Sequence, residues 1–240
     1  MGLWEAATTT ATLAKTPDPA DEWPLVFNRA RTKPCPMTSA LPPAPDFGTA
    51  LPVAAAPEVL RFLALRRSTS ATTLTTPAPD ADQVADLLRL ATRVPDHGKL
   101  TPWRFIVLEG AGKVAFAERL DALARDRSDP MLSAKLAKLK IPPLAVVVVS
   151  SPKPAAIPQW EQQLSAGAVC QTLVTAALAM GFGANWITDW YSYDADATAL
   201  LGLSDPERVA GVILIGTPRE APLERERPPV AITRWTQEGL

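Results

Sequence analysis

The chain has 240 residues, of which 47% are apolar and 20% are charged, and these proportions are ordinary for a globular protein in water. This length is sufficient for one domain with a substantial core, with or without a tail. The formal net charge of −1 provides no excess of basic side chains to neutralise phosphates, which argues against a nucleic-acid partner.

The first part of the chain differs from the rest. Residues 1–54 are rich in Pro, Thr and Ala and show no helical or strand period. Such a segment cannot bury enough apolar surface to offset the entropy of ordering it. We therefore predict a disordered leader over residues 1–54 and one folded domain over residues 55–240. Translation from Met37, just before the patterned region, is an open alternative.

The regular pattern begins at Pro57, a residue suited to the first turn of a helix. Apolar residues with the spacing of one helical face follow it, namely Val59, Leu60, Phe62 and Leu63. We expect this helix to end at Arg66-Arg67.

The next helix has the clearest pattern. Its apolar residues fall at i, i+3, i+4 and i+7, namely Val84, Leu87, Leu88 and Ala91. Asp80 and Gln83 have the spacing of a capping box at its start. The helix should stop near Val94, because Pro95 disfavours helical geometry in the residue before it.

Strands and helices both follow after residue 100. We expect strands at 103–109, 144–149, 182–188 and 209–215. We expect helices after the glycines at 110 and 112, at 130–140, at 159–180 and at 194–201. Strict alternation of strand and helix is absent, so this order favours a mixed α+β sandwich over a Rossmann domain. The tail after Pro218 is rich in proline and charge, so it needs another surface to settle on.

The helix expected at 159–180 is apolar nearly all round after Ser165, which is typical of a helix in the centre of a core or in a dimer interface. Residues 166–180 are the most apolar stretch, but they include one Gln and two Thr. This stretch is also shorter than the roughly 20 residues that span a membrane, so we expect no membrane partner.

Several kinds of chemistry are missing from the sequence. The two cysteines, Cys35 and Cys170, have neither metal-ligand nor redox spacing, so we expect no metal site, no disulfide framework and a cytoplasmic location. No nucleophile elbow or paired catalytic carboxylates stand out. If the chain is an enzyme, a cofactor therefore carries the difficult chemistry.

The first candidate binding segment is Arg66-Arg67-Ser68, at the end of the first expected helix. Each guanidinium is a planar fork that matches phosphate oxygens, and the serine adds a further donor. The structural alternative is that both arginines complement the helix dipole, at about 0.3–1 kcal/mol each.

The second candidate segment holds His97, the single histidine of the chain. Pro95 and Pro102 stiffen this segment, and Lys99 and Thr101 supply further donors. Donors beside N1 and O2 of an isoalloxazine ring would stabilise its reduced anion. The alternative is an ordinary surface or core histidine.

Two later segments are weaker signals. Gly181-Phe182-Gly183 lacks the third glycine of a dinucleotide fingerprint, and a helix stop of the Schellman type is the better structural interpretation. Trp186-Ile187-Thr188 could place backbone groups along a flavin edge or could be a core strand. Trp160-Glu161 opens the long helix, where it could serve as a cap with a packing anchor.

Taken together, these segments make the chain resemble the FMN-dependent nitroreductase superfamily, and most closely its small YdjA-like members. The resemblance covers roughly residues 55–218. The segments that carry it are Arg66-Arg67-Ser68-Thr69-Ser70, Arg93-Val94-Pro95-Asp96-His97 with Pro102-Trp103, Trp160-Glu161-Gln162 with Ser165-Ala166-Gly167, Gly181-Phe182-Gly183 with Trp186, and Gly216-Thr217-Pro218.

The resemblance implies an α+β, three-layer sandwich in which helices flank a mostly antiparallel mixed sheet, and it implies a homodimer with two FMN sites at the subunit interface. NADH or NADPH would be the reductant in ping-pong, two-electron turnover. A nitroaromatic, a quinone or a similar small molecule would accept the electrons. A flavin-binding module without turnover, for storage or sensing, is the main alternative, and a structural dimer without cofactor is a second.

The resemblance also implies roles for particular residues. Arg66-Arg67-Ser68 would hold the FMN phosphate and ribityl chain. His97 and Thr101 would lie against the flavin from the partner subunit, and Trp186-Ile187-Thr188 would border it. Thr101 departs from relatives of this type, which usually carry a longer amide side chain there, so one ring contact is lost or replaced by water.

Overall fold

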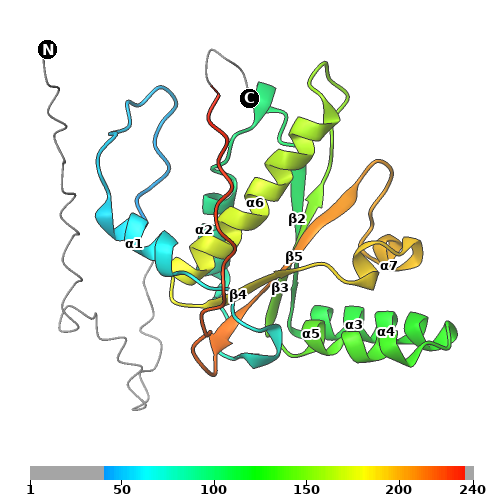
Figure 1. Cartoon of the computed structure of the whole chain (residues 1–240). Helices are drawn as coiled ribbons and strands as arrows, with labels where there is room; N and C mark the ends of the chain where they lie inside the picture. The colour runs from blue at the N-terminus through cyan, green and yellow to red at the C-terminus, as the bar shows by residue number, and fades with distance from the viewer. Residues whose placement is uncertain (1–40, 236–240) are drawn as a thin grey trace, which may run out of the picture. The chain divides into compact units, whose positions relative to one another are not determined.

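A sheet of five strands forms the centre of the domain, and helices lie against both of its faces (Figure 1). The computed structural model describes residues 41–235, so the leader predicted over residues 1–54 lies mostly outside the described residues. The described residues belong to one compact unit.

The strands are β1 (Leu74–Thr75), β2 (Trp103–Glu109), β3 (Leu144–Ser150), β4 (Gly183–Ile187) and β5 (Arg208–Pro218). Their order across the sheet is β1-β5-β3-β2, and β4 also pairs with β5. Every pairing among the described residues is antiparallel, so the parallel component of the expected mixed sheet does not occur within them. The four strands predicted from the sequence are confirmed. The two-residue β1 was not predicted, because so short a strand has no alternating pattern to detect.

The helices are α1 (Pro57–Leu65), α2 (Ala81–Ala91), α3 (Gly110–Asp126), α4 (Pro130–Lys135), α5 (Ala137–Lys140), α6 (Gln159–Ala179) and α7 (Ala195–Leu200). Three short 3₁₀ turns are η2 (Ala71–Thr73), η3 (His97–Lys99) and η4 (Trp190–Ser192). The expected helix at 130–140 is two helices, because the backbone at Leu136 is the C-cap of α4 and the N-cap of α5.

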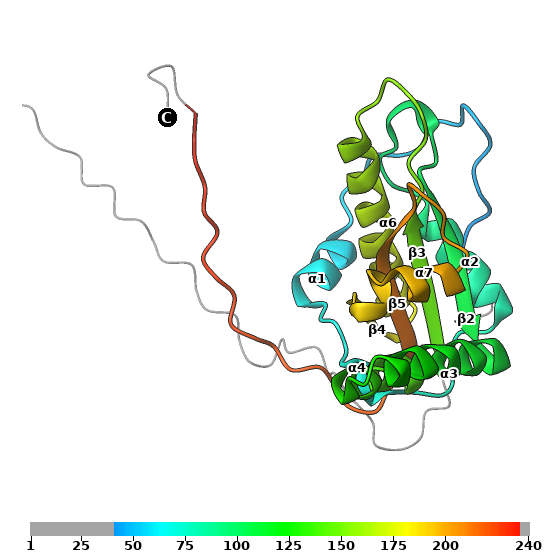
Figure 2. The ribbon, with the colours of Figure 1, turned by 90° about the vertical axis from the view of Figure 1, so that its right-hand side faces the viewer.

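The sheet separates two apolar cores, which makes the domain a sandwich of three layers. One core contains α2, α6 and the side chains of Val146, Val148, Ile213 and Ile215. The other core contains Val147, Val149, Val212 and Leu214 together with α3, α5 and α7. The two helix layers can be followed to either side of the sheet in Figures 1 and 2. Every residue of β3 is buried, as expected for a strand covered on both faces.

Helix α6 confirms the expectation of a central helix, because nine of its 21 residues are buried. Trp160 and Leu164, near its start, remain exposed. Among residues 41–235, no helix is long and apolar enough to cross a membrane.

The start of α2 confirms the predicted capping box. The Asp80 carboxylate accepts a hydrogen bond from the Gln83 backbone N–H at 2.9 Å, and the Gln83 side chain accepts one from the Asp80 N–H at 3.0 Å. Two donors at the helix start are therefore satisfied reciprocally.

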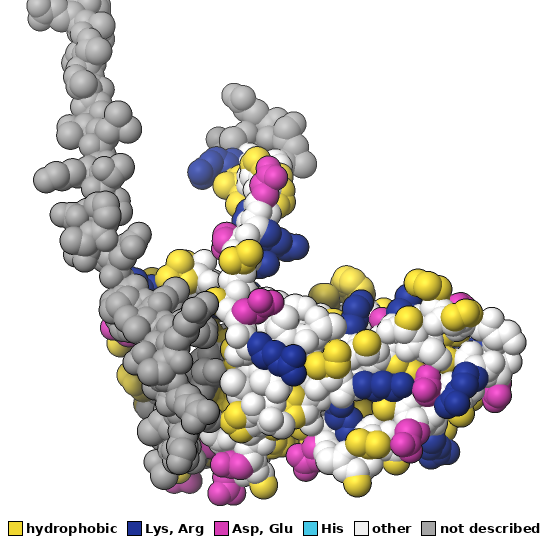
Figure 3. All heavy atoms as spheres, turned by 90° about the horizontal axis from the view of Figure 1, so that it is seen from below, with side chains coloured by type: hydrophobic (Ala, Val, Ile, Leu, Met, Phe, Trp, Pro, Cys, Tyr) yellow, Lys and Arg dark blue, Asp and Glu magenta, His cyan; other side chains and the backbone are white. Residues whose placement is uncertain are grey.

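Charged side chains of both signs are interspersed on the face seen from below in Figure 3. On α3, Asp121 lies 3.1 Å from Lys140 of α5 and 3.7 Å from Arg125, and it also accepts a hydrogen bond from Ser133 of α4 at 2.8 Å. The Ser133 and Lys140 hydrogen bonds lower the pKa of Asp121. This carboxylate therefore links three helices of the outer layer.

An ion pair between β2 and the residue just before β5 predicts how stability depends on pH. Arg104 donates two hydrogen bonds of 2.7 Å to Glu207, and this pairing lowers the pKa of Glu207 to about 2. An unfolded glutamate has a pKa of about 4.3, so this stabilisation is complete above about pH 5 and is lost as the pH falls toward 2.

We therefore expect the free energy of unfolding to fall by about 1–2 kcal/mol more in the wild type than in a Glu207→Gln variant over that range, after allowance for solvent screening. Urea unfolding at a series of pH values measures this difference. A Glu118→Gln variant is the control, because Glu118 is exposed on α3. Parallel pH profiles for the wild type and Glu207→Gln would contradict the assignment.

The thiol of Cys170 is fully buried in α6, and burial raises its pKa to about 12. Only a thiolate reacts readily with thiol reagents. We expect Cys170 of a Cys35→Ser variant to resist a disulfide reagent such as DTNB in the folded protein and to react fully in denaturant. Rapid labelling of the folded variant would show that the core opens around α6.

Candidate functional site

The end of α1 presents Arg66 with unused hydrogen-bonding capacity. Arg66 is the C-cap of the helix and has an extended backbone, with φ −62° and ψ 140°. One terminal nitrogen of its guanidinium lies 3.4 Å from the Ser68 hydroxyl. Its Nε is buried and has no hydrogen-bond partner within residues 41–235. A buried donor without a partner is costly, so this nitrogen is suited to an acceptor from outside the chain.

Arg67 is engaged differently. Its Nε donates to the backbone carbonyl of Leu223 at 3.1 Å and lies 3.5 Å from Glu224. Arg67 therefore holds the start of the C-terminal segment, and only part of its fork remains for another acceptor.

The segment after these arginines is attached to β4. The Thr69 N–H donates to the carbonyl of Ala184 at 2.9 Å, and the Asn185 side chain donates to the carbonyl of Thr69 at 2.5 Å. A Cβ at Gly183 would lie 2.5 Å from Leu74 and 3.0 Å from the Thr69 hydroxyl. This glycine therefore permits close packing of two segments, and the structure brings Arg66-Arg67-Ser68 near the strand that contains Trp186.

The preceding glycine ends α6 in the predicted way. Gly181 has a φ of +86°, its N–H bonds the carbonyl of Leu178 at 3.0 Å, and the Phe182 N–H bonds that of Ala177 at 3.0 Å. These two bonds define a Schellman motif. The Gly-Phe-Gly sequence is therefore a helix stop followed by a packing contact.

The residues of 186–188 point in different directions. Trp186 is 38% exposed, and its indole lies so close to Gly211 of β5 that a Cβ there would overlap it. Ile187 packs against the core on the opposite face, as the structural alternative predicts. Thr188 is exposed, and its hydroxyl accepts a hydrogen bond from Tyr193 at 2.8 Å.

His97 and Thr101 lie near the other end of α6. His97 Nδ1 is 2.7 Å from a carboxylate oxygen of Glu161, and the Ser165 hydroxyl donates to the carbonyl of Pro95 at 2.5 Å. The 21 residues of α6 span about 30 Å at 1.5 Å per residue. Within one chain, His97 and Thr101 are therefore not brought together with Arg66, which lies near the strand that follows α6.

Asp96 organises the turn that carries His97 and was not singled out from the sequence. Its carboxylate accepts hydrogen bonds from the backbone N–H groups of Leu100 at 3.1 Å and Thr101 at 2.9 Å. Lys99 and Thr101 have φ values of 56° and 49°, in the left-handed region. Such residues cost about 1–3 kcal/mol each and occur where surrounding contacts impose them. The Asp-His-Gly sequence was the available signal, since Asp favours such local turns.

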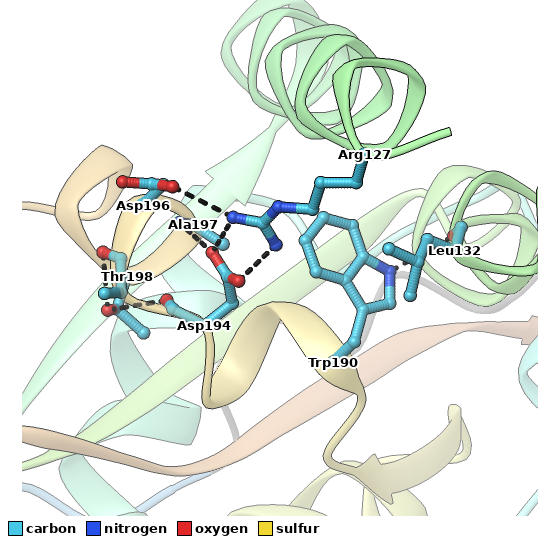
Figure 4. A network of polar contacts seen from close by, with 8 residues as sticks. Arg127, Leu132, Trp190, Asp194, Asp196, Ala197 and Thr198 are labelled. Carbon is cyan, nitrogen blue, oxygen red and sulfur yellow. Dashed lines mark hydrogen bonds and ion pairs between the residues drawn. The ribbon is translucent and has the colours of Figure 1, made fainter. Parts of the chain in front are cut away.

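The segment that follows Thr188 is fixed to the outer helices by Arg127 at the end of α3 (Figure 4). The guanidinium bonds Asp194 at 2.8 Å and Asp196 at 2.9 Å, and it stacks 5.7 Å from the ring of Trp190. The Trp190 indole N–H donates to the carbonyl of Leu132 at 3.1 Å. The hydrogen bonds from Arg127 lower the pKa of Asp194. This network holds η4 and α7 in place beyond β4.

No group of three or more His, Cys, Asp or Glu side chains in residues 41–235 is arranged to hold a metal ion. Around Arg66 the polar groups are mainly hydrogen-bond donors, whereas at His97 an imidazole faces a carboxylate.

Comparisons with known proteins agree with this architecture. The model of the nitroreductase family matches residues 63–217. YdjA of Escherichia coli K12, an NAD(P)H nitroreductase by name, is 32% identical over 165 residues, which are 68% of this chain and 89% of YdjA. A Haemophilus influenzae protein with the same activity in its name is 34% identical over 173 residues, 70% of this chain and 92% of the relative.

Solved structures show the same fold. A nitroreductase-like protein from Bacillus cereus has a TM-score of 0.61 at 24% identity and covers 75% of this chain and 95% of its own. A nitroreductase with bound FMN from Bacteroides fragilis has a TM-score of 0.57 at 20% identity and covers 74% of this chain and 99% of its own. With its family match over most of the folded domain, the chain belongs to the nitroreductase family.

Proposed function

We propose that this protein is an FMN-dependent oxidoreductase that uses NADH or NADPH to reduce a nitroaromatic, a quinone or a similar small acceptor by ping-pong, two-electron turnover. Bound FMN supplies the redox chemistry, and the chain binds it, orients it and sets its electrostatic surroundings. The curated relatives are named for NAD(P)H nitroreductase activity, and the Bacteroides fragilis neighbour holds FMN. We place the protein in the cytoplasm as part of this proposal.

The observation that carries the proposal is the unpartnered guanidinium nitrogen of Arg66. Its Nε is buried without an acceptor among the described residues, and the Ser68 hydroxyl lies beside the same guanidinium. A phosphate offers several acceptor oxygens and suits the planar fork of an arginine. The donors at the end of α1 therefore fit the FMN phosphate. Trp186, on the neighbouring strand and partly exposed, would border the rest of the cofactor.

We further propose that the site is completed in a homodimer, with His97 and Thr101 supplied by the partner subunit. The reason is that α1 has no buried residue, although it carries the apolar side chains Val59, Leu60, Leu63 and Leu65, which are 50–69% exposed. A helix of nine residues is marginal in water unless its apolar face packs on another surface.

Other exposed apolar groups support the same proposal. Trp160 and Leu164 on α6 are 66% and 53% exposed. The C-terminal segment carries four more exposed large apolar residues: Leu223, Val230, Ile232 and Trp235. A second subunit that packs on these elements would remove such groups from water, which favours association.

The test is a titration of the purified protein with FMN, followed by anaerobic addition of NADH or NADPH and then of a nitroaromatic or a quinone. We expect the flavin absorbance to bleach with the nicotinamide and to return with the acceptor, and we expect a dimer in sedimentation equilibrium. If the protein is yellow with FMN and neither NADH nor NADPH bleaches it, the result would instead indicate a non-catalytic flavin-binding module. Protein that stays colourless with FMN would indicate a dimer without cofactor.

A further inference from the structure

The contact between His97 and Glu161 fixes which ring nitrogen carries hydrogen. Nδ1 of His97 lies 2.7 Å from Oε2 of Glu161. An ionised carboxylate has only acceptors, so the hydrogen of this bond must be on Nδ1. In a neutral ring the other nitrogen, Nε2, then has a lone pair and is an acceptor.

The surrounding structure holds both partners of this contact. Glu161 lies in the first turn of α6, and Ser165, one turn later, donates to the carbonyl of Pro95 at 2.5 Å. Gly98, directly after the histidine, has a φ of +72°, and a Cβ there would collide with Ile157. The backbone on both sides of His97, at Pro95 and at Gly98, therefore packs against α6 and the residue segment just before it.

The edge of the His97 ring that carries Nε2 is accessible to a ligand. The side chain of His97 is 67% exposed, and Nε2 has no hydrogen-bond partner in the part of the chain that the structure describes. The charged group that contacts the ring is Glu161 on α6, and the turn that contains His97 also includes Asp96 and Lys99. The Asp96 carboxylate is occupied by the backbone N–H groups of Leu100 and Thr101.

We propose that Glu161 is a positioning residue that fixes neutral His97 in the form with hydrogen on Nδ1, so that Nε2 meets the cofactor as a hydrogen-bond acceptor. This inference rests on the proposed function, because the ligand of Nε2 is FMN. A flavin offers matching donors, the N3–H of its ring and the hydroxyls of its ribityl chain. The sequence suggested the opposite direction for the hydrogen bond, with the histidine as a donor beside N1 and O2 of the flavin. Because Nδ1 already carries hydrogen, Nε2 could donate only if the ring were doubly protonated.

The histidine is the only one in the chain, so its ¹⁵N resonances can be assigned without ambiguity. The experiment compares long-range ¹H–¹⁵N spectra of the wild-type, Glu161→Ala and Glu118→Gln proteins, without and with saturating FMN. Spectra are taken at high pH, so that the neutral form of the ring is observed. Glu118 is exposed on α3 and serves as the matched loss of a carboxylate.

In the wild type and in Glu118→Gln, we expect a protonated Nδ1 and an unprotonated Nε2. In Glu161→Ala we expect the reverse, a protonated Nε2 and an unprotonated Nδ1, because free histidine favours hydrogen on Nε2. Addition of FMN should shift the Nε2 resonance of the wild type. Unfolding would produce the same exchange, because it also frees the histidine, so the amide spectrum of each variant must first show that the variant is folded.

Hydrogen on Nε2 in the wild type, or an unchanged pattern in Glu161→Ala, would overturn the role of Glu161 whether or not FMN binds. An unmoved Nε2 resonance in FMN-saturated protein would overturn the contact with the cofactor and leave FMN binding intact. If FMN does not bind at all, the proposed function fails together with that contact, while the Nδ1 assignment stands on the spectra without FMN.

Discussion

An Arg66→Ala variant is expected to bind FMN about tenfold to a hundredfold more weakly than the wild type, which corresponds to the loss of one charge-assisted contact of roughly 1.5–3 kcal/mol. The reason is that Arg66 has a buried nitrogen without an acceptor in the described chain. Fluorescence titration of the protein with FMN measures the change in Kd.

Two further variants make this test specific. Arg119→Ala removes an exposed arginine of α3 and should leave the Kd for FMN unchanged. Arg67→Ala should have a smaller effect than Arg66→Ala, because Arg67 already bonds Leu223 and lies near Glu224. Equal FMN affinity in Arg66→Ala and the wild type would remove Arg66 from the site.

The largest effect on stability is expected from Leu173→Ala. Leu173 is fully buried in α6, in the core that this helix shares with α2 and the sheet. Truncation of such a leucine loses its transfer free energy and leaves a cavity, at a cost of about 2–5 kcal/mol. For a domain of this size, Tm should fall by roughly 5–20 °C.

Thermal unfolding followed by circular dichroism measures this change. Val114→Ala on α3 is the matched control, because the Val114 side chain is 57% exposed and its truncation should change stability by less than about 0.5 kcal/mol. A Tm for Leu173→Ala close to that of this control would mean that the core around α6 repacks without a cavity.

Elements with strong local signals were predictable from the sequence. The capping box of α2, the buried run of β3 and the glycine stop of α6 each depend on residues close together in the chain. The division of residues 130–140 at Leu136 was not predictable, because both halves have helical patterns and only the backbone at one residue separates them.

The candidate site was predictable in its parts and not in its arrangement. The sequence identified Arg66 and Trp186, but the attachment of the first segment to β4 depends on Asn185 and Thr69, which are 116 residues apart. The partner of His97 is 64 residues away on α6. Periodicity and local spacing carry no information about such distant contacts, so the polarity of the histidine ring could only be derived from the folded chain.

The overlap that any side chain at Gly211 would make with Trp186 has a consequence for comparisons within the family. The indole of Trp186, the largest side chain of β4, packs directly on the backbone of β5 at Gly211. A relative with alanine at this place must tilt or replace the ring above it, so the surface that this ring presents changes with one small residue. The exposed part of the indole can therefore differ between relatives because of a residue that lies beneath it.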